Sequence, residues 1–425
     1  MPGATFAGLS PERLSLSNGA VVLAKQVRTT PAVTINLAVR AGSVCDPVGT
    51  PGAMYLLSRV IDRGTDRRTA DDIAEELDSR GIALAVTVTR HLFTVACTCL
   101  AEDFEPVFAL LGDIVRAPSL PETEIATRKG EVITAIRQDE DNPAVRATEA
   151  LMALLYPDGH PYGRRTKGSV ESVEALTRDD LVRLHADRFA PGRLSAVIVG
   201  DVPTALVTDA ADRVFGDWRK PEPPPVPVLT VAPVSGRRSL VIPMMNKAQA
   251  DIAYGFVAMT RDDPDYYAGW LMNNALGQYS LGGRLGDSIR ERQGMAYYVF
   301  SSLDANVMQG PITVRAGVGP ADVDRAIASI DEELRHVSLE GLSAKELNAS
   351  RQYLIASMPR ALETNAGIAA FLQTVEFFGL GLDYDLRLPD LLRAVTVEQA
   401  HDVARRLLDP DRATVVIAGP YEAKK

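Results

Sequence analysis

The chain has 425 residues, of which 46% are hydrophobic and 24% are charged, a globular composition that excludes fibrous and largely disordered proteins. Its 55 acidic and 45 basic residues give a net charge of −10, which argues against a general binder of nucleic-acid phosphates. The length predicts two or three domains.

The N-terminus and the cysteines give no sign of export. The first residues lack a basic start followed by an apolar stretch, and no run of about 18 apolar residues occurs. We therefore expect a soluble, cytoplasmic chain, or a periplasmic one if a signal peptide has been removed. Three cysteines, Cys45, Cys97 and Cys99, are too few for a disulfide framework, so we expect buried, reduced thiols.

Strand and helix signals follow one another along the first half. Asn18-Gly19 between alternating segments predicts a hairpin, and residues 33–39 alternate as a half-buried strand. Hydrophobic periodicity predicts strands within 82–100 and helices near 51–62, 70–80, 103–116 and through most of 122–155. Thr177 and Thr396 each precede a helix whose exposed amides their hydroxyls can cap.

No group of residues has the spacing of a metal site. The chain has five histidines, and no two of them lie three or four positions apart: His91, His160, His185, His336 and His401. His185 and Asp187 lie two apart on a predicted helix and so face different sides, and we expect a surface histidine. The acidic run 139–141 is expected to be a solvated helix end before Pro143.

A proline-rich stretch, residues 221–227, separates two halves that resemble each other. A shift of 219 positions lays 194–200 over 413–419 without a gap, and it also pairs Thr177 with Thr396. One offset that holds over a long span predicts a duplication.

Each half runs from strands through helices to a closing strand. We therefore predict an α+β fold of two homologous domains, each an antiparallel-rich sheet covered on one face by helices. The N-terminal domain is predicted at 10–218 and the C-terminal domain at 235–425, with a proline-rich linker at 219–234.

Motifs in both halves resemble the pitrilysin/insulinase family of zinc peptidases, which includes the mitochondrial processing peptidase. They lie at residues 160–164, 167–169, 176–181 and 197–201 in the first half and at 282–285 and 289–297 in the second. The resemblance extends over essentially the whole chain and implies the processing peptidase-like fold.

Catalytic members of that family carry an inverted zinc motif, His-x-x-Glu-His, on an early helix. On the matching helix Met54, Leu57 and Ser58 stand at the first histidine, the general-base glutamate and the second histidine. Ala135 stands where the resemblance places the third ligand, and Arg128 replaces the glutamate that accompanies it. These side chains cannot hold zinc or deprotonate its water, so the resemblance implies a subunit with no metal of its own.

The second half keeps the residues that a non-catalytic subunit would contribute. Arg290 is expected near the end of a helix that Gly294 terminates, and Tyr297 follows seven positions later on the next strand. In the family an arginine and a tyrosine at this spacing reach the peptide bound at the zinc of a sister subunit. Both are hydrogen-bond donors that can hold a carbonyl or a carboxylate. Tyr298 is expected to point to the opposite, core side of the strand.

Two further segments have counterparts in the family. Gly282 and Gly283 predict a tight start to a helix, and a substrate-sensing glycine-rich loop is the alternative. Residues 82–89 correspond to the strand whose edge pairs with substrate, and without zinc beside it we expect a structural role.

The resulting hypothesis is a non-catalytic, substrate-binding subunit of a heteromeric zinc endopeptidase. Arg290 and Tyr297 would position a peptide at the zinc of a catalytic sister subunit, and neither nucleic acid nor a membrane span is expected. The net charge of −10 would favour basic peptides. The alternatives are a structural core-type subunit with no role in proteolysis and a self-associating peptide-binding module.

Overall fold

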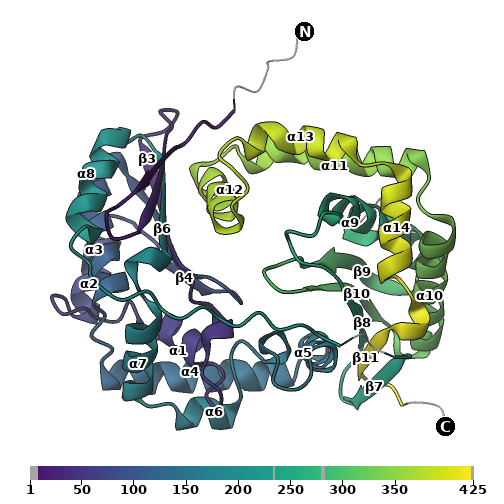
Figure 1. Cartoon of the computed structure of the whole chain (residues 1–425). Coiled ribbons are helices and arrows are strands. Elements are labelled where there is room, and N and C mark those ends of the chain that lie inside the picture. The colour runs from purple at the N-terminus through teal and green to yellow at the C-terminus, as the bar shows by residue number, and fades with distance from the viewer. Residues whose placement is uncertain (1–7, 233–234, 279–282, 423–425) are drawn as a thin grey trace. The chain divides into compact units, whose positions relative to one another are not determined.

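The computed structural model describes residues 8–232, 235–278 and 283–422, and the chain forms two units, each with one β-sheet (Figure 1). Unit 1 consists of Met1–Ile136, Arg165–Val226 and Met358–Arg387. Unit 2 consists of Arg137–Arg164, Pro227–Ser357 and Leu388–Lys425. Each unit therefore takes segments from both halves of the sequence.

Unit 1 is built on a six-stranded sheet. Its strands are β1 (Glu12–Ser15), β2 (Val21–Gln26), β3 (Ala32–Val39), β4 (Ala85–Val88), β5 (Phe93–Leu100) and β6 (Leu194–Gly200). Its helices are α1 (Ala53–Val60), α2 (Ala70–Asp78), α3 (Phe104–Arg116), α6 (Val170–Ala175), α7 (Arg178–Arg188), α8 (Thr204–Phe215) and α12 (Asn365–Phe378). Helix α4 (Glu122–Glu140) begins in this unit.

The strand order is β1-β2-β6-β3-β5-β4, and among the strands described in this sheet only β2 and β6 pair parallel. The predicted hairpin is confirmed, because β1 and β2 pair antiparallel across Gly19, whose φ of 89° is accessible to glycine at little cost. The sheet is therefore antiparallel-rich, as predicted. Strand β4 forms an edge and pairs with β5 alone among the strands described.

Helices cover both faces of this sheet, so the expectation of one covered face is wrong. Every residue of β6 is buried, which a strand with one solvated face would not allow. Val197 and Val199 pack with Ile368 and Leu372 of α12, while α3 and α8 lie across the other face (Figure 1). The extra cover was not predicted because it comes from the second half of the sequence.

Unit 2 is built on a five-stranded sheet. Its strands are β7 (Arg238–Pro243), β8 (Ala250–Val257), β9 (Ala296–Leu303), β10 (Pro311–Val318) and β11 (Thr414–Gly419). Its helices include α5 (Pro143–Leu155), α9 (Tyr266–Asn273), α10 (Val323–Glu340) and α14 (Val397–Leu407), with π-helices at Asn274–Gln278 and Gly286–Arg292. Helices α11 (Ala344–Ala361) and α13 (Tyr384–Ala394) have residues in both units.

The second sheet repeats the first. Its order is β7-β11-β8-β10-β9, and the parallel pairing of β7 with β11 corresponds to that of β2 with β6. The offset of 219 lays β6 over β11 and β3 over β8 to within one residue. Two homologous domains with one α+β topology are therefore present, as the duplication predicted.

The two halves exchange corresponding helices. Helix α12 packs on β6 and β3 of unit 1, and α5 packs on β8 and β11 of unit 2 (Figure 1). In unit 2, Leu151 of α5 lies against Gly255 of β8. The domain boundaries at 10–218 and 235–425 mark the two copies of the sequence repeat, and they stay a prediction. The two compact units have other bounds, because each sheet is covered by a helix from the other half of the sequence.

Several local predictions are confirmed. Thr177 and Thr396 cap α7 and α14 in reciprocal capping boxes. Asn142 caps α5 directly after the acidic end of α4, so the run 139–141 is a helix end. The three cysteines, all within the described residues, are buried thiols outside any disulfide. Within residues 8–232, 235–278 and 283–422, no helix has the length and hydropathy needed to cross a bilayer.

Candidate functional site

Helix α1 carries three of the positions at which the resemblance predicts zinc ligands and the general base of catalytic relatives. Its first amides are fixed by Asp46, whose two oxygens accept from Gly52 N at 2.8 Å and from Met54 N at 2.7 Å. Gly52 has a φ of 91°, and a Cβ there would lie 2.4 Å from the Lys167 carbonyl oxygen. The start of α1 is therefore held rigidly in the body of unit 1.

The side chains at these positions belong to the core. Met54 and Leu57 are 0% exposed, and Ser58 is buried with its hydroxyl donating to the Tyr55 carbonyl at 2.7 Å. A thioether and an alkyl chain packed in apolar surroundings offer no strong ligand for zinc, and the serine hydroxyl is already occupied. These residues do not fit the metal.

The position predicted for the third ligand, on α4, is also unsuited to zinc. Ala135 presents only a half-buried methyl group. Two turns earlier Arg128 forms ion pairs with Glu124, at 3.4 Å from Nη2 to Oε2, and with Glu131. The hydrogen bond to Glu131 raises the pKa of Arg128, so a fixed positive charge replaces a carboxylate beside this position. Across the described part of the chain, no group of three His, Cys, Asp or Glu side chains could hold a metal ion.

Arg290 lies where it was predicted, near the end of a helix that Gly294 terminates. The π-helix Gly286–Arg292 is followed by Gly294 with a φ of 64°, and Gly294 N donates to the Arg290 carbonyl at 3.0 Å. The guanidinium is exposed and contacts Glu291 at 3.6 Å from Nε to Oε1. That distance exceeds a hydrogen bond, so its donors can reach a ligand.

Tyr297 is the second residue of β9, an edge strand of the second sheet, and is 74% exposed. Its phenol makes no hydrogen bond to any residue of the described segments. A buried tyrosine usually finds a hydrogen-bond partner for its hydroxyl, whereas the exposed phenol of Tyr297 is left to solvent. Arg290 and Tyr297 thus occupy one unit, on either side of Gly294, with their polar groups in solvent.

Tyr298, the next residue, is turned toward the body of unit 2. It is half-buried, and its hydroxyl donates to the buried carboxylate of Asp251. Burial together with this bond raises the pKa of Tyr298. The opposite orientations of the two tyrosines follow the alternation of a β-strand, as predicted.

The predicted glycine turn is described only in part. Gly282 lies outside the described residues. Gly283 packs closely on the preceding helical segment, because a Cβ there would lie 2.9 Å from the Gly277 Cα. Helical backbone begins at residue 284, directly after Gly283, so the described part agrees with the predicted helix start.

The prediction of a surface position for His185 is wrong. The residue is 7% exposed, and its Nε2 lies 2.9 Å from the Val115 carbonyl oxygen at the end of α3. Leu181 and Leu184 are buried on the same helix. Helix α7 has few apolar residues, so its sequence pattern did not indicate which face packs against the rest of unit 1.

Comparison with known proteins gives a consistent result. A model of the insulinase family, peptidase family M16, matches residues 21–167, and a model of the peptidase M16 inactive domain matches residues 175–354. An uncharacterized zinc protease of Mycobacterium leprae is 27% identical over 421 residues, covering 97% of this chain and 92% of the relative. One of Bacillus subtilis is 23% identical over 411 residues, covering 96% of this chain and 98% of the relative.

Solved structures agree over nearly the full length. A peptidase M16 inactive domain from Pseudomonas fluorescens matches with a TM-score of 0.87 and 25% identity, covering 98% of this chain and 99% of that one. A protease from Helicobacter pylori has the same fold, with a TM-score of 0.88 at 16% identity and coverage of 96% and 99%. Both family models, in adjacent parts of the sequence, point to one family. The chain belongs to the M16 peptidase family.

Proposed function

We propose that this M16 family member is a non-catalytic, substrate-binding subunit of a heteromeric zinc endopeptidase. A sister subunit supplies the zinc, the attacking water and the general base. This chain supplies Arg290 and Tyr297, which hold the peptide in place for attack. Its partners are therefore a zinc-bearing sister chain and a peptide.

The main support is the contrast between the two sets of family positions. Met54 and Leu57 are fully buried in the core, whereas Arg290 and Tyr297 are exposed with donors directed to solvent. The absence of catalytic residues alone would not distinguish a substrate-binding subunit from a purely structural one. Two exposed donors kept at the expected spacing favour continued contact with a substrate.

The chemistry of the pair suits a peptide backbone. A guanidinium offers several N–H donors and a phenol offers one O–H donor, so together they can bind adjacent carbonyl oxygens or a terminal carboxylate. Neither group has to break a strong internal interaction first, because the Arg290 to Glu291 pair is exposed and long.

The experiment is reconstitution with a zinc-bearing sister chain from the same organism. The chain alone should contain no stoichiometric zinc and cleave no peptide, and the mixture should cleave. Arg290→Ala and Tyr297→Phe should each reduce kcat/KM of the mixture by about tenfold or more, the value of one or two charge-assisted or neutral hydrogen bonds.

Arg292→Ala is the matched control, because Arg292 is exposed on the same π-helix but pairs with Asp287 at 3.0 Å. It should leave kcat/KM unchanged. Activity that survives both Arg290→Ala and Tyr297→Phe would instead support the structural core-type subunit. Metal analysis that finds one zinc per isolated chain would refute the non-catalytic assignment.

A further inference from the structure

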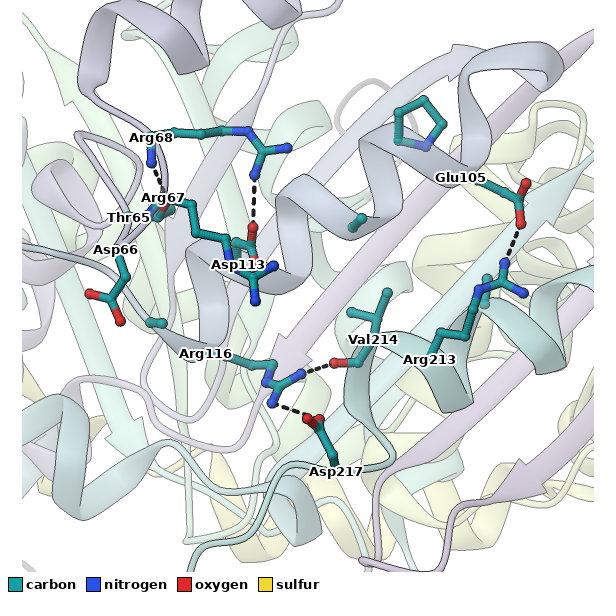
Figure 2. Close-up of a pocket in the computed structure, with 14 residues that line it drawn as sticks. Thr65, Asp66, Arg67, Arg68, Glu105, Asp113, Arg116, Arg213, Val214 and Asp217 are labelled. Atoms are coloured by element: carbon teal, nitrogen blue, oxygen red, sulfur yellow. Dashed lines mark hydrogen bonds and ion pairs between the residues drawn. The ribbon is translucent and has the colours of Figure 1, made fainter.

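Unit 1 contains a cavity of about 1110 Å³, and none of its lining residues takes part in the proposed function (Figure 2). Its walls are the loop 65–68, helices α3 and α8, and the turn after α8. The two helices touch at Gly112, where a Cβ would lie 2.2 Å from a methyl carbon of Val214. The cavity is thus framed by rigidly packed elements.

Four arginines line the cavity: Arg67, Arg68, Arg116 and Arg213 (Figure 2). Arg68 has a structural role, since its Nε donates to Glu76 at 3.0 Å and its Nη1 to Asp113 at 2.7 Å. Arg213 forms an exposed pair with Glu105. The remaining two arginines differ in how firmly they are held.

Arg116 is a fixed cation with a replaceable counterion. One of its Nη atoms donates to the Val214 carbonyl, and the other lies 2.7 Å from Asp217 Oδ1. The Arg116 side chain is 25% exposed, whereas that of Asp217 is 78% exposed. Because an exposed carboxylate contributes little to such a pair, another anion can take its place.

Among the residues that the structure describes, none places a carboxylate within hydrogen-bonding distance of Arg67. The nearest described one is Asp113, whose Oδ1 lies 3.8 Å from Arg67 Nη1 and whose Oδ2 already accepts from Arg68. Its backbone is nevertheless fixed, because Arg67 N donates to the Thr65 hydroxyl at 3.2 Å. The guanidinium of Arg67 therefore has N–H donors available for a ligand, and the loop that carries it is constrained.

We propose that this cavity binds a small molecule through an oxyanion, a phosphate or a carboxylate, held by Arg67 and Arg116. Planar guanidinium groups bind such anions through paired N–H donors. Pro106, Ala109, Ala117 and Ala210 leave an uncharged wall for the rest of the ligand. The site stands whether or not the chain serves as a peptidase subunit.

Isothermal titration of the full chain with inorganic phosphate and, separately, with citrate at constant ionic strength tests the site. At least one probe should bind saturably with one site per chain. Arg67→Ala should weaken that binding by about tenfold. Asp217→Asn should tighten it, because the competing carboxylate is removed from Arg116.

Arg183→Ala is the control, since Arg183 is exposed in unit 1, pairs with Asp180 and does not line the cavity. Binding of phosphate alone would assign a phosphorylated ligand, and binding of citrate alone a carboxylate. Absence of saturable binding by either probe would overturn the proposal. So would equal losses in the Arg67 and Arg183 variants, provided that circular dichroism shows both folded.

Discussion

At the residue scale, the side chains at the predicted zinc positions have structural contacts. Met54 and Leu57 are packed as core residues, and the Ser58 hydroxyl bonds within its own helix. The prediction that these positions lack zinc ligands rests on residue identities and the resemblance alone. They could not predict that Arg128 would join two glutamates in an ion-pair group, because its partners are fixed by helix geometry.

His185 should make the stability of unit 1 depend on pH. Burial lowers the pKa of His185 from 6.5 to about 4, so the folded state keeps a neutral ring while the unfolded chain takes up a proton. The neutral histidine contributes its full share to the free energy of unfolding above pH 6.5, and that share is lost as the pH falls toward 4. Urea unfolding should give a free energy of unfolding that is lower at pH 5 than at pH 7.5 by about 2 kcal/mol because of this residue.

His185→Gln should remove that part of the loss, because an amide can still donate to the Val115 carbonyl and does not titrate. His336→Gln is the control, since His336 is exposed and pairs with Glu340 at 3.2 Å. If His185→Gln and His336→Gln unfold with the same pH dependence, the buried histidine is not the cause.

At the level of elements, the π-helix that carries Arg290 is fixed at its start by an ion pair. Arg284 Nε and Nη2 lie 2.6 and 3.0 Å from the two oxygens of Glu346, in the first turn of α11. Burial alone would raise the pKa of Glu346, but hydrogen bonds from Arg284 and Ser343 lower it to about 2. This bidentate pair orients the helix and, with it, Arg290.

Arg284→Lys should loosen this helix, because an ammonium cannot bind both carboxylate oxygens in the same fork geometry. We expect a loss of about 1–2 kcal/mol in local stability. Amide hydrogen exchange over residues 286–294 should be faster than in the unmodified chain. Arg335→Lys is the control, because Arg335 forms an exposed pair with Asp411, and it should leave exchange over residues 286–294 unchanged. If these amides exchange equally fast in the Arg284 and Arg335 variants, the anchoring role is wrong.

Sequence patterns predicted most elements but not their partners. The hairpin at Gly19 and the caps at Thr177 and Thr396 depend on a few neighbouring residues, so local chemistry decides them. Helix α12 is different, because its apolar face fits any apolar sheet. Nothing in its periodicity indicates that Leu372 packs on β6.

The same limit applied to the arginine cavity. Arg67, Arg116 and Arg213 are far apart in the sequence, and each resembles an ordinary surface residue. Only the packing of α3 on α8 brings them together. By contrast, Arg290 and Tyr297 lie in a single motif, so they could be named from the sequence.

For the whole molecule, the exchange of α5 and α12 makes the two halves of the chain depend on each other. A fragment of residues 1–226 lacks α12, and a fragment of residues 227–425 lacks α5. Neither fragment should unfold cooperatively alone, because each leaves an apolar sheet face exposed. Mixed together, they should recover one cooperative thermal transition by circular dichroism and elute as a one-to-one complex.

Leu372→Ala in the second fragment should weaken this association by about 2–5 kcal/mol, the cost of a cavity under α12. Thr374→Ala, on the exposed face of the same helix, should have little effect. Cooperative unfolding of either fragment by itself would contradict the mutual dependence.

The distance in sequence between β6 and α12 also sets a delay during synthesis. The first sheet is complete once Gly200 has been made, but α12 ends at Phe378, which is 178 residues later (378 − 200). At about 5–20 residues per second, the ribosome needs roughly 10–40 s to supply it. Throughout that interval Val197 and Val199 lack the cover that α12 gives them, so the nascent protein exposes apolar surface that a chaperone can bind.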